Sequence, residues 1–275
     1  MTNGNPITRR GAIATVTAAS AGVMAAAASG NLVVPAQAQT QRKTFVLVHG
    51  AWHGGWCWRR VSDLLEKQGH KVFTPTLTGV GERAHLLSKD INLDTHITDV
   101  VNVFKFEDLK DVCLVAHSYG GWPCSGALEQ IGDRVSSIIW LDAFKPANGE
   151  TVMDYASEFN RKAFQAAIDR GEPGRAPPKA AVFHVNEKDR AWVDSKMTPQ
   201  PNGVAVQPIK LTGAREKIAK KTYIRAPKFP QSGFQKAYAE CKADKTWKTY
   251  ETTEAGHDVM IDTPQWLVDV INKES

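Results

Sequence analysis

Short apolar runs rich in β-branched residues alternate with longer segments of helical spacing from Lys43 onward. In the segment 58–68, for example, Val61, Leu64 and Leu65 share one helical face and Gly69 follows as a stop signal. The run 111–116 is wholly apolar after its first residue, as a buried parallel strand should be. This alternation is typical of an α/β fold with helices on both faces of a parallel sheet.

The pattern predicts a mostly parallel sheet of about six strands. The predicted strands are 44–48, 71–74, 111–116, 135–141, 221–225 and 247–251, and the predicted helices are 58–68, 93–104, 119–131, 233–242 and 264–272. Residues 144–218 break the rhythm, with helical patches around 153–169 and a Pro/Gly-rich stretch at 171–178. We expect a helical cap over the strand ends in this insertion, with a disordered excursion as the alternative.

Residues 1–38 resemble an export signal. Arg9 and Arg10 precede a weakly apolar Ala/Thr/Val run, and Ala36 and Ala38 form an Ala-x-Ala exit before Gln39. The paired arginines favour the twin-arginine route over the general secretory route, although the Phe and Lys often found after them are missing. The run is too poor in Leu, Ile and Phe for a good membrane anchor. We therefore predict cleavage, a periplasmic or secreted protein without a stable membrane anchor, and a single domain over 39–275.

Composition excludes several classes of protein. Hydrophobic residues make up 42% and charged residues 23% of the 275 residues, as in soluble globular chains. The net charge of +5 falls to +3 without the two leader arginines, and the basic residues are scattered, which argues against nucleic acid as a partner. The chain has four cysteines and no Cys-x-x-Cys pair, so we expect small buried hydrophobic residues rather than disulfides or a zinc site.

Ser118 is the candidate nucleophile. It lies in Ala116-His-Ser-Tyr-Gly-Gly, a small-x-Ser-x-Gly turn between a predicted buried strand and a predicted helix. Such a turn exposes the serine hydroxyl at the strand end, beside the free N–H groups of the helix N-terminus. The motif alone occurs by chance, and its placement gives it weight.

His257 is the candidate base, because it follows the last predicted strand and a glycine, in the chain order Ser before His. The other seven histidines lack such a strand-end position or, for His117, are expected to point away from the site. The Gly-rich passage after the first strand can bring backbone N–H groups toward a developing oxyanion. We assign that role to the N–H of Ala51, with Trp52 as the alternative, together with that of Tyr119. A metal site at His49 and His53 is disfavoured, since no carboxylate or cysteine is near them in sequence.

Three motifs carry a family resemblance: FVLVHGAWHGGWCW, AHSYGG and GHDVM. Together they resemble the α/β-hydrolase superfamily, and within it the plant methylesterase and hydroxynitrile lyase group and its bacterial esterase relatives. The resemblance covers essentially 43–272. It implies a Ser/His/acid triad, a lid over the sheet, and ester hydrolysis without a cofactor or a metal.

The acid departs from the family pattern. The family usually carries it just after the penultimate strand, but the segment 226–236 contains no Asp or Glu. We assign the acid to Asp142, directly after the fourth predicted strand, at the same edge of the sheet as Ser118. A cap-anchoring carboxylate or helix N-cap is the alternative role for Asp142, and Asp258 is the second candidate for the acid.

The sequence favours a serine esterase acting on a small carboxylic ester. A C–C lyase, an acyltransferase or haloperoxidase-like activity, and a non-catalytic ligand-binding protein of the same fold are the alternatives. The lyases of the group place a lysine after the terminal histidine, where this chain has Asp258. Trp52 and Trp122 near the predicted mouth favour an apolar or aromatic substrate, although tryptophans more often serve in packing. We expect a monomer or a homodimer.

Overall fold

A six-stranded parallel sheet forms the centre of the protein in a computed structural model that describes Met1 and residues 41–275. The predicted signal segment therefore lies outside the described residues, apart from Met1. The strand order is β2-β1-β3-β4-β7-β8, and all five pairings are parallel. The strands are β1 (Thr44–Val48), β2 (Lys71–Phe73), β3 (Val112–His117), β4 (Val135–Leu141), β7 (Lys220–Arg225) and β8 (Trp247–Glu251). The predicted six-stranded parallel sheet is confirmed.

Four strand ends differ from the prediction, each by one residue. The third strand ends at His117 and not at Ala116, and the fifth begins at Lys220 and not at Lys221. The third strand begins at Val112 and not at Asp111, because Asp111 has a φ of 52°, which is outside the extended region. The second strand ends at Phe73 and not at Thr74. The helix predicted over 119–131 begins as a 3₁₀ turn, η3 (Ser118–Gly120), and becomes α-helical at Gly121.

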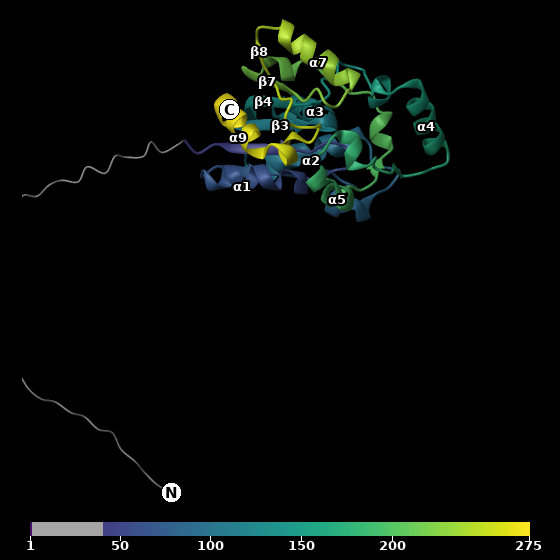
Figure 1. The fold of residues 1–275 in the computed structure, drawn as a ribbon, viewed down its shortest axis with the longest axis horizontal. Helices are drawn as coiled ribbons and strands as arrows, with labels where there is room; N and C mark the ends of the chain where they lie inside the picture. Colours follow the sequence, from purple (N-terminus) through teal and green to yellow (C-terminus); the bar gives the residue numbers. More distant parts are fainter. Residues whose placement is uncertain (2–40) are drawn as a thin grey trace, which may run out of the picture. The chain divides into compact units, whose positions relative to one another are not determined.

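Helices cover both faces of the sheet (Figure 1). Side chains alternate between two faces along a strand, so β1 sends Val46 and Val48 into one core and Phe45 and Leu47 into the other. The first core includes residues of α2 (Leu93–Phe106), α3 (Gly121–Ile131) and α7 (Ser232–Ala243), and the second includes residues of α1 (Arg59–Lys67), α5 (Glu187–Lys196), α8 (Val259–Asp262) and α9 (Pro264–Glu274). All four cysteines are buried and free, and they pack in these two cores.

The segment between β4 and β7 is ordered into short elements, not a disordered excursion. It holds α4 (Glu158–Asp169), α5, α6 (Ala214–Lys217) and a two-stranded antiparallel ladder of β5 (Gly174–Arg175) and β6 (Gln200–Pro201). Its role as a cap stays a prediction. Among the residues described, no helix is both long and apolar enough to span a membrane.

Candidate active site

Strand register brings two of the candidates, Ser118 and Asp142, together with Arg225 at one edge of the sheet. His117 on β3 pairs with Leu141 on β4, and Leu141 pairs with Ile224 on β7. The next residues along these strands are therefore neighbours at the carboxyl edge: Ser118, Asp142 and Arg225. The carboxyl edge of such a sheet is where α/β proteins usually bind ligands.

Ser118 occupies a tight turn that only small neighbours permit. Its φ is 54°, in the left-handed region, which is rare for a residue other than glycine and costs about 1–3 kcal/mol. A Cβ atom at Gly50 would lie 2.8 Å from the Ser118 Cβ, and one at Gly121 would lie 2.0 Å from the Phe144 carbonyl oxygen. Glycine at these positions lets the loops after β1 and β4 close around the turn. Within residues 41–275 the Ser118 hydroxyl makes no hydrogen bond, so it is free to meet a ligand.

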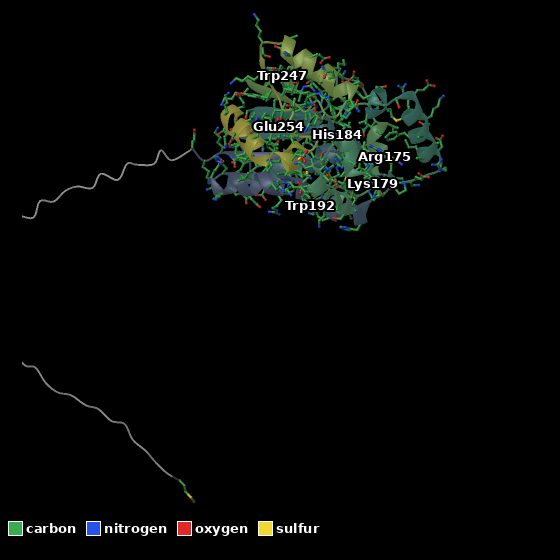
Figure 2. The ribbon with its side chains drawn as sticks, viewed as in Figure 1. Arg175, Lys179, His184, Trp192, Trp247 and Glu254 are labelled. Atoms are coloured by element: carbon green, nitrogen blue, oxygen red, sulfur yellow. The ribbon has the colours of Figure 1, made fainter. Side chains whose placement is uncertain are left out.

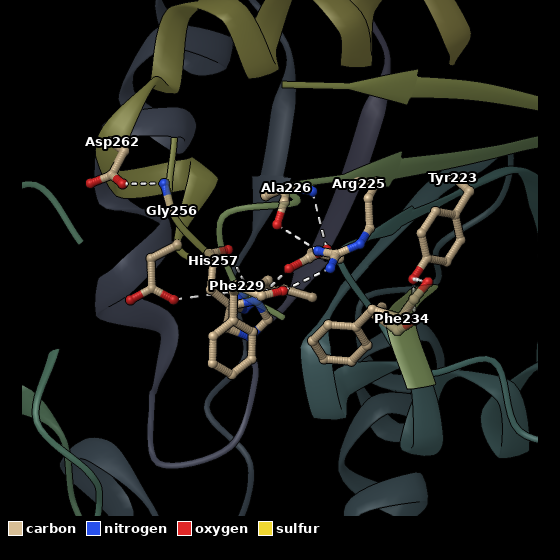
Figure 3. A network of polar contacts seen from close by, with 12 residues as sticks. Tyr223, Arg225, Ala226, Phe229, Phe234, Gly256, His257 and Asp262 are labelled. Atoms are coloured by element: carbon tan, nitrogen blue, oxygen red, sulfur yellow. Dashed lines mark hydrogen bonds and ion pairs between the residues drawn. The ribbon is translucent and has the colours of Figure 1, made fainter. Parts of the chain in front are cut away.

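His257 is held by its backbone and one ring nitrogen. Its N–H donates to the Phe183 carbonyl at 2.8 Å, and its ring stacks on Phe234 at 5.2 Å and 14° (Figure 3). Its Nδ1 lies 2.7 Å from Oδ2 of Asp142. An ionised carboxylate only accepts hydrogen bonds, so Nδ1 carries the proton and Nε2 is the nitrogen left to accept one. The distance is within the usual hydrogen-bond range of about 2.6–3.2 Å.

Asp142 is fully buried and has three hydrogen-bond donors. Besides His257, Arg225 donates from Nη1 to Oδ1, and the Ala226 N–H donates to the same oxygen at 3.1 Å (Figure 3). Arg225 also donates to the carbonyl oxygens of Ala226 and Phe229. Arg225, the last residue of β7, thus binds the carboxylate at the end of the neighbouring strand.

The two candidate oxyanion donors in the first loop are the N–H groups of Ala51 and Trp52, and within residues 41–275 only one of them already has a hydrogen-bond partner. Trp52 N–H donates to Oε1 of Gln200 at 2.9 Å, so it would have to leave this partner to serve an oxyanion, which favours Ala51 over Trp52. Ala51 N–H has no hydrogen-bond partner among the described residues. Tyr119 N–H belongs to the first turn of η3, where N–H groups have no partner within the helix. Both remain candidates for an oxyanion hole.

Aromatic side chains surround the imidazole. The rings of Phe229 and Phe183 lie 4.6 and 5.7 Å from the His257 ring, and Trp52 lies 5.9 Å from Phe183. Ser118 is 8% exposed and His257 3%, so the reacting groups are shielded from bulk water. Trp122, the other predicted pocket residue, is fully buried against Tyr155 and Phe144 at the start of α3.

A second buried network lies behind His257. His53 contacts the Ala51 carbonyl through Nδ1 at 2.8 Å and Oδ2 of Asp258 through Nε2 at 3.1 Å. Both partners are acceptors, so His53 carries both ring protons. Burial by itself would lower its pKa, but the charge of Asp258 and the hydrogen bond to it raise the pKa overall. For Asp258, burial by itself would raise the pKa, and the charge of His53 lowers it to about 2.

Three features of the site were not predicted: the His53–Asp258 pair, the contact of His117 with His257, and the role of Arg225. Asp258 lies 205 residues from His53, so no carboxylate near His53 in sequence could have revealed the pair. His117, expected to point away from the site, contacts the His257 carbonyl through Nε2 at 3.1 Å, and its ring lies 4.5 Å from that of His257. For Arg225, the one available signal was a charged residue directly after the apolar pair Tyr223 and Ile224, at the end of a predicted strand.

One cluster in the described part of the chain has the residue types of a metal site: ligand atoms of His117, His257 and Asp258 lie within 4.8 Å of one another. These three side chains are poorly suited to bind a metal ion, because two of them are already used by other groups. Asp258 is already paired with the His53 cation, and His257 Nδ1 is bound to Asp142.

A surface hollow between β2 and α2, lined in part by Phe73 and Phe106, shares no residue with the site.

Comparison with known proteins decides the family. The model of the alpha/beta hydrolase family matches residues 45–270. This chain belongs to the α/β-hydrolase family. A carbendazim-hydrolysing esterase of Nocardioides sp. (strain SG-4G) is 37% identical over 234 residues, which cover 82% of this chain and 96% of that protein. Methyl jasmonate esterase 1 of Vitis vinifera is 27% identical over 221 residues, 76% of this chain and 82% of its own.

A solved structure supports the fold. An extracellular α/β-hydrolase from a Paenibacillus species superposes with a TM-score of 0.73 at 24% identity, covering 85% of this chain and 99% of that one. The resemblance inferred from the three motifs is thus confirmed, and this α/β-hydrolase is an enzyme of the esterase type.

Proposed function

We propose that this α/β-hydrolase cleaves a small carboxylic ester with Ser118 as nucleophile, His257 as general base and Asp142 as the acid of the triad. The observation that carries the proposal is the 2.7 Å contact between Asp142 Oδ2 and His257 Nδ1. It fixes the imidazole tautomer that leaves Nε2 able to take a proton. The strained turn at Ser118, on the neighbouring strand end, supports the same assignment.

The reaction follows from these roles. Ser118 Oγ attacks the ester carbonyl carbon while its proton passes to His257 Nε2, and Asp142 stabilises the imidazolium that forms. In this proposal the N–H groups of Ala51 and Tyr119 donate to the oxyanion. When the tetrahedral intermediate collapses, the alcohol leaves with the proton from Nε2. Water, activated by the same nitrogen, then hydrolyses the acyl-enzyme and restores Ser118.

The substrate class follows from the surroundings of His257. Phe183, Phe229 and Trp52 make its environment aromatic, which favours an ester with an apolar or aromatic body. The names of the relatives, a carbendazim-hydrolysing esterase and a methyl jasmonate esterase, point to small esterase substrates. No step of the reaction requires a cofactor.

A panel of p-nitrophenyl esters of rising acyl length, with carbendazim, a cyanohydrin and a lactone beside it, tests the proposal. We expect turnover of short esters and a loss of about 10⁴- to 10⁶-fold in Ser118→Ala. An organophosphonate should label Ser118 in the wild type. Labelling of another residue would refute the nucleophile assignment, and full labelling without turnover of any ester would favour an acyltransferase or a binding protein.

The lyase alternative has less support. Asp258, at the position where lyases of the group carry a lysine, is fully buried and paired with His53, so it offers no cation to a cyanohydrin. Cleavage of the cyanohydrin faster than of every ester would reverse this preference.

We further propose that the chain is exported and that residues 1–38 are removed. The support is the Arg9–Arg10 pair and the Ala-x-Ala exit, together with an extracellular structural neighbour. Sequencing the mature N-terminus should return Gln39 or a residue within a few positions of it. A stable full-length cytoplasmic form would contradict export.

A further inference from the structure

Arg175 lies in the two-stranded ladder of β5 and β6, which contacts the loop after β1. Its guanidinium is a cation that makes no hydrogen bond within the described residues. Arg175 belongs to β5 and is labelled in Figure 2. Its guanidinium carbon lies 5.1 Å from the centre of the Trp52 ring and 4.3 Å from that of Phe164. Its Nε and Nη1 are inaccessible to solvent and have no partner among the described residues. Stacking stabilises the faces of a guanidinium and leaves its N–H groups to find acceptors.

Two more donors near Arg175 are also unpaired. Gln200 is the ladder partner of Arg175, and its Oε1 accepts the Trp52 N–H at 2.9 Å. The Nε2 of Gln200 and the Nε1 of Trp52 are buried without partners in the part of the chain described. The three side chains thus bring together several N–H donors and no free acceptor. A buried donor without an acceptor costs free energy, so this group of residues is suited to an acceptor from outside the chain.

The charge of this cluster is also uncompensated. Burial lowers the pKa of Arg175 to about 9, which still leaves it a cation at neutral pH. Tyr119 is the group that acts on it electrostatically, and burial raises the Tyr119 pKa, so that phenol is neutral. No salt bridge to Arg175 occurs within residues 41–275. An acceptor that also carries negative charge would satisfy both the donors and the cation.

The cluster adjoins the proposed catalytic machinery. Trp52 directly follows Ala51, the oxyanion candidate, and Tyr119 directly follows Ser118. Trp52 also reaches the imidazole through Phe183, which contacts both rings. These contacts link Arg175 to the loop of Ala51 and to the imidazole, so a ligand with two polar groups is the kind that could meet both Arg175 and Ser118.

We propose that Arg175, with Gln200 and Trp52, binds a carboxylate on the substrate, so that the preferred ester is the half-ester of a dicarboxylic acid. This rests on the proposed ester hydrolysis and adds a second polar group to its apolar or aromatic body. The alternative is that Arg175 serves only to stack the ladder on Trp52. The two differ in whether its loss affects anionic esters selectively.

The test compares matched charged and neutral esters. The probes are monomethyl isophthalate and monomethyl terephthalate, each against the methyl ester of m- or p-toluic acid, in which a methyl replaces the carboxylate. We expect the wild type to prefer the better half-ester by at least about 10-fold in kcat/KM. Arg175→Met keeps an apolar stem between the rings and should lose about 10- to 100-fold on the half-ester and less than about 3-fold on the toluate.

Two variants complete the design. Lys179→Met removes an exposed cation of the same segment, paired with Asp194 at 3.9 Å, and should leave the preference unchanged. Arg175→Lys keeps the charge without the planar fork and should show an intermediate preference, which also covers the case in which Arg175→Met fails to fold. Equal losses on both esters, or a wild type that favours the toluates, would overturn the proposal. No hydrolysis of any ester would instead contradict the proposed function.

Discussion

Arg225 and Asp142 form a buried ion pair directly behind the His257 imidazole. Arg225 Nη1 lies 2.5 Å from Oδ1 of Asp142, with side-chain exposures of 2% and 0%, while Oδ2 of the same carboxylate contacts His257 Nδ1 (Figure 3). The Asp142 carboxylate therefore accepts hydrogen bonds from a permanent cation, Arg225, and from the proposed catalytic base, His257. Because both charged groups are out of water, each depends on the other for its stability.

Replacing Arg225 should destabilise the fold. Arg225→Met leaves the Asp142 charge without its guanidinium and two carbonyl groups without a donor, so we expect the free energy of unfolding to fall by about 3–5 kcal/mol. Urea unfolding would measure it. Lys228→Met, an exposed control three residues beyond the strand, should stay within about 0.5 kcal/mol. A change below about 1 kcal/mol in Arg225→Met would show that the pair is not structural.

The two candidate acids can be separated by their amides. Asp142→Asn should lower kcat by about 10³- to 10⁴-fold with a folded chain, because the imidazole loses its tautomer control and the stabilisation of its positive charge. Asp258→Asn should act mainly on stability, since Asp258 contacts His53 and not the His257 ring. Turnover of a p-nitrophenyl ester measures the activity of each variant, and circular dichroism shows whether each variant is folded. The reverse pattern would move the role to Asp258.

His53 links the loop of Ala51, the proposed oxyanion donor, to the loop that carries His257. It donates to the Ala51 carbonyl and to Asp258, and a glutamine cannot satisfy both partners in the same way. His53→Gln should lower kcat by about 10-fold with little change in KM, because loss of oxyanion donation acts on the transition state. His85→Gln, at an exposed position, is the control. A rise in KM alone would show that His53 supports substrate binding instead.

The protonation of His53 also predicts how that variant depends on pH. Its folded pKa is raised, so its contribution to stability is fully present below the unfolded pKa of about 6.5 and is lost as pH rises through the folded value. The stability difference between wild type and His53→Gln should therefore be larger at pH 6 than at pH 9. An equal difference at both values would mean that the ion pair contributes nothing measurable.

Other buried histidines make the protein sensitive to acid. Burial lowers the pKa of His49 to about 3 and that of His96 to about 4, and His49 Nε2 accepts the Leu77 N–H, which requires a neutral ring. Below pH 6.5 the unfolded chain binds protons that the folded one does not, so stability falls with pH. From pH 7 to 5 these two groups should cost about 3–4 kcal/mol, measurable by urea unfolding. Stability that is unchanged or higher at pH 5 would contradict this.

The elements of this protein are determined locally. Apolar runs of strand length, helical periodicity and the glycines around Ser118 are features of neighbouring residues, and they predict the six strands, the main helices and the turn at the nucleophile. The insertion was predictable only as a break in that pattern, because its short helices and the two-residue strands β5 and β6 lack a periodic signal long enough to read.

The chemistry of the site depends on contacts that local sequence does not encode. Asp142 lies 115 residues from His257 and 83 from Arg225, and these side chains meet only because β3, β4 and β7 are adjacent in the sheet and in register at their carboxyl ends. The motif around Ser118 thus predicts a candidate nucleophile from sequence alone. The tertiary structure decides which carboxylate reaches the imidazole, which cation shares it, and which donors near Arg175 stay unpaired, since hydrogen bonds and burial depend on distance in space.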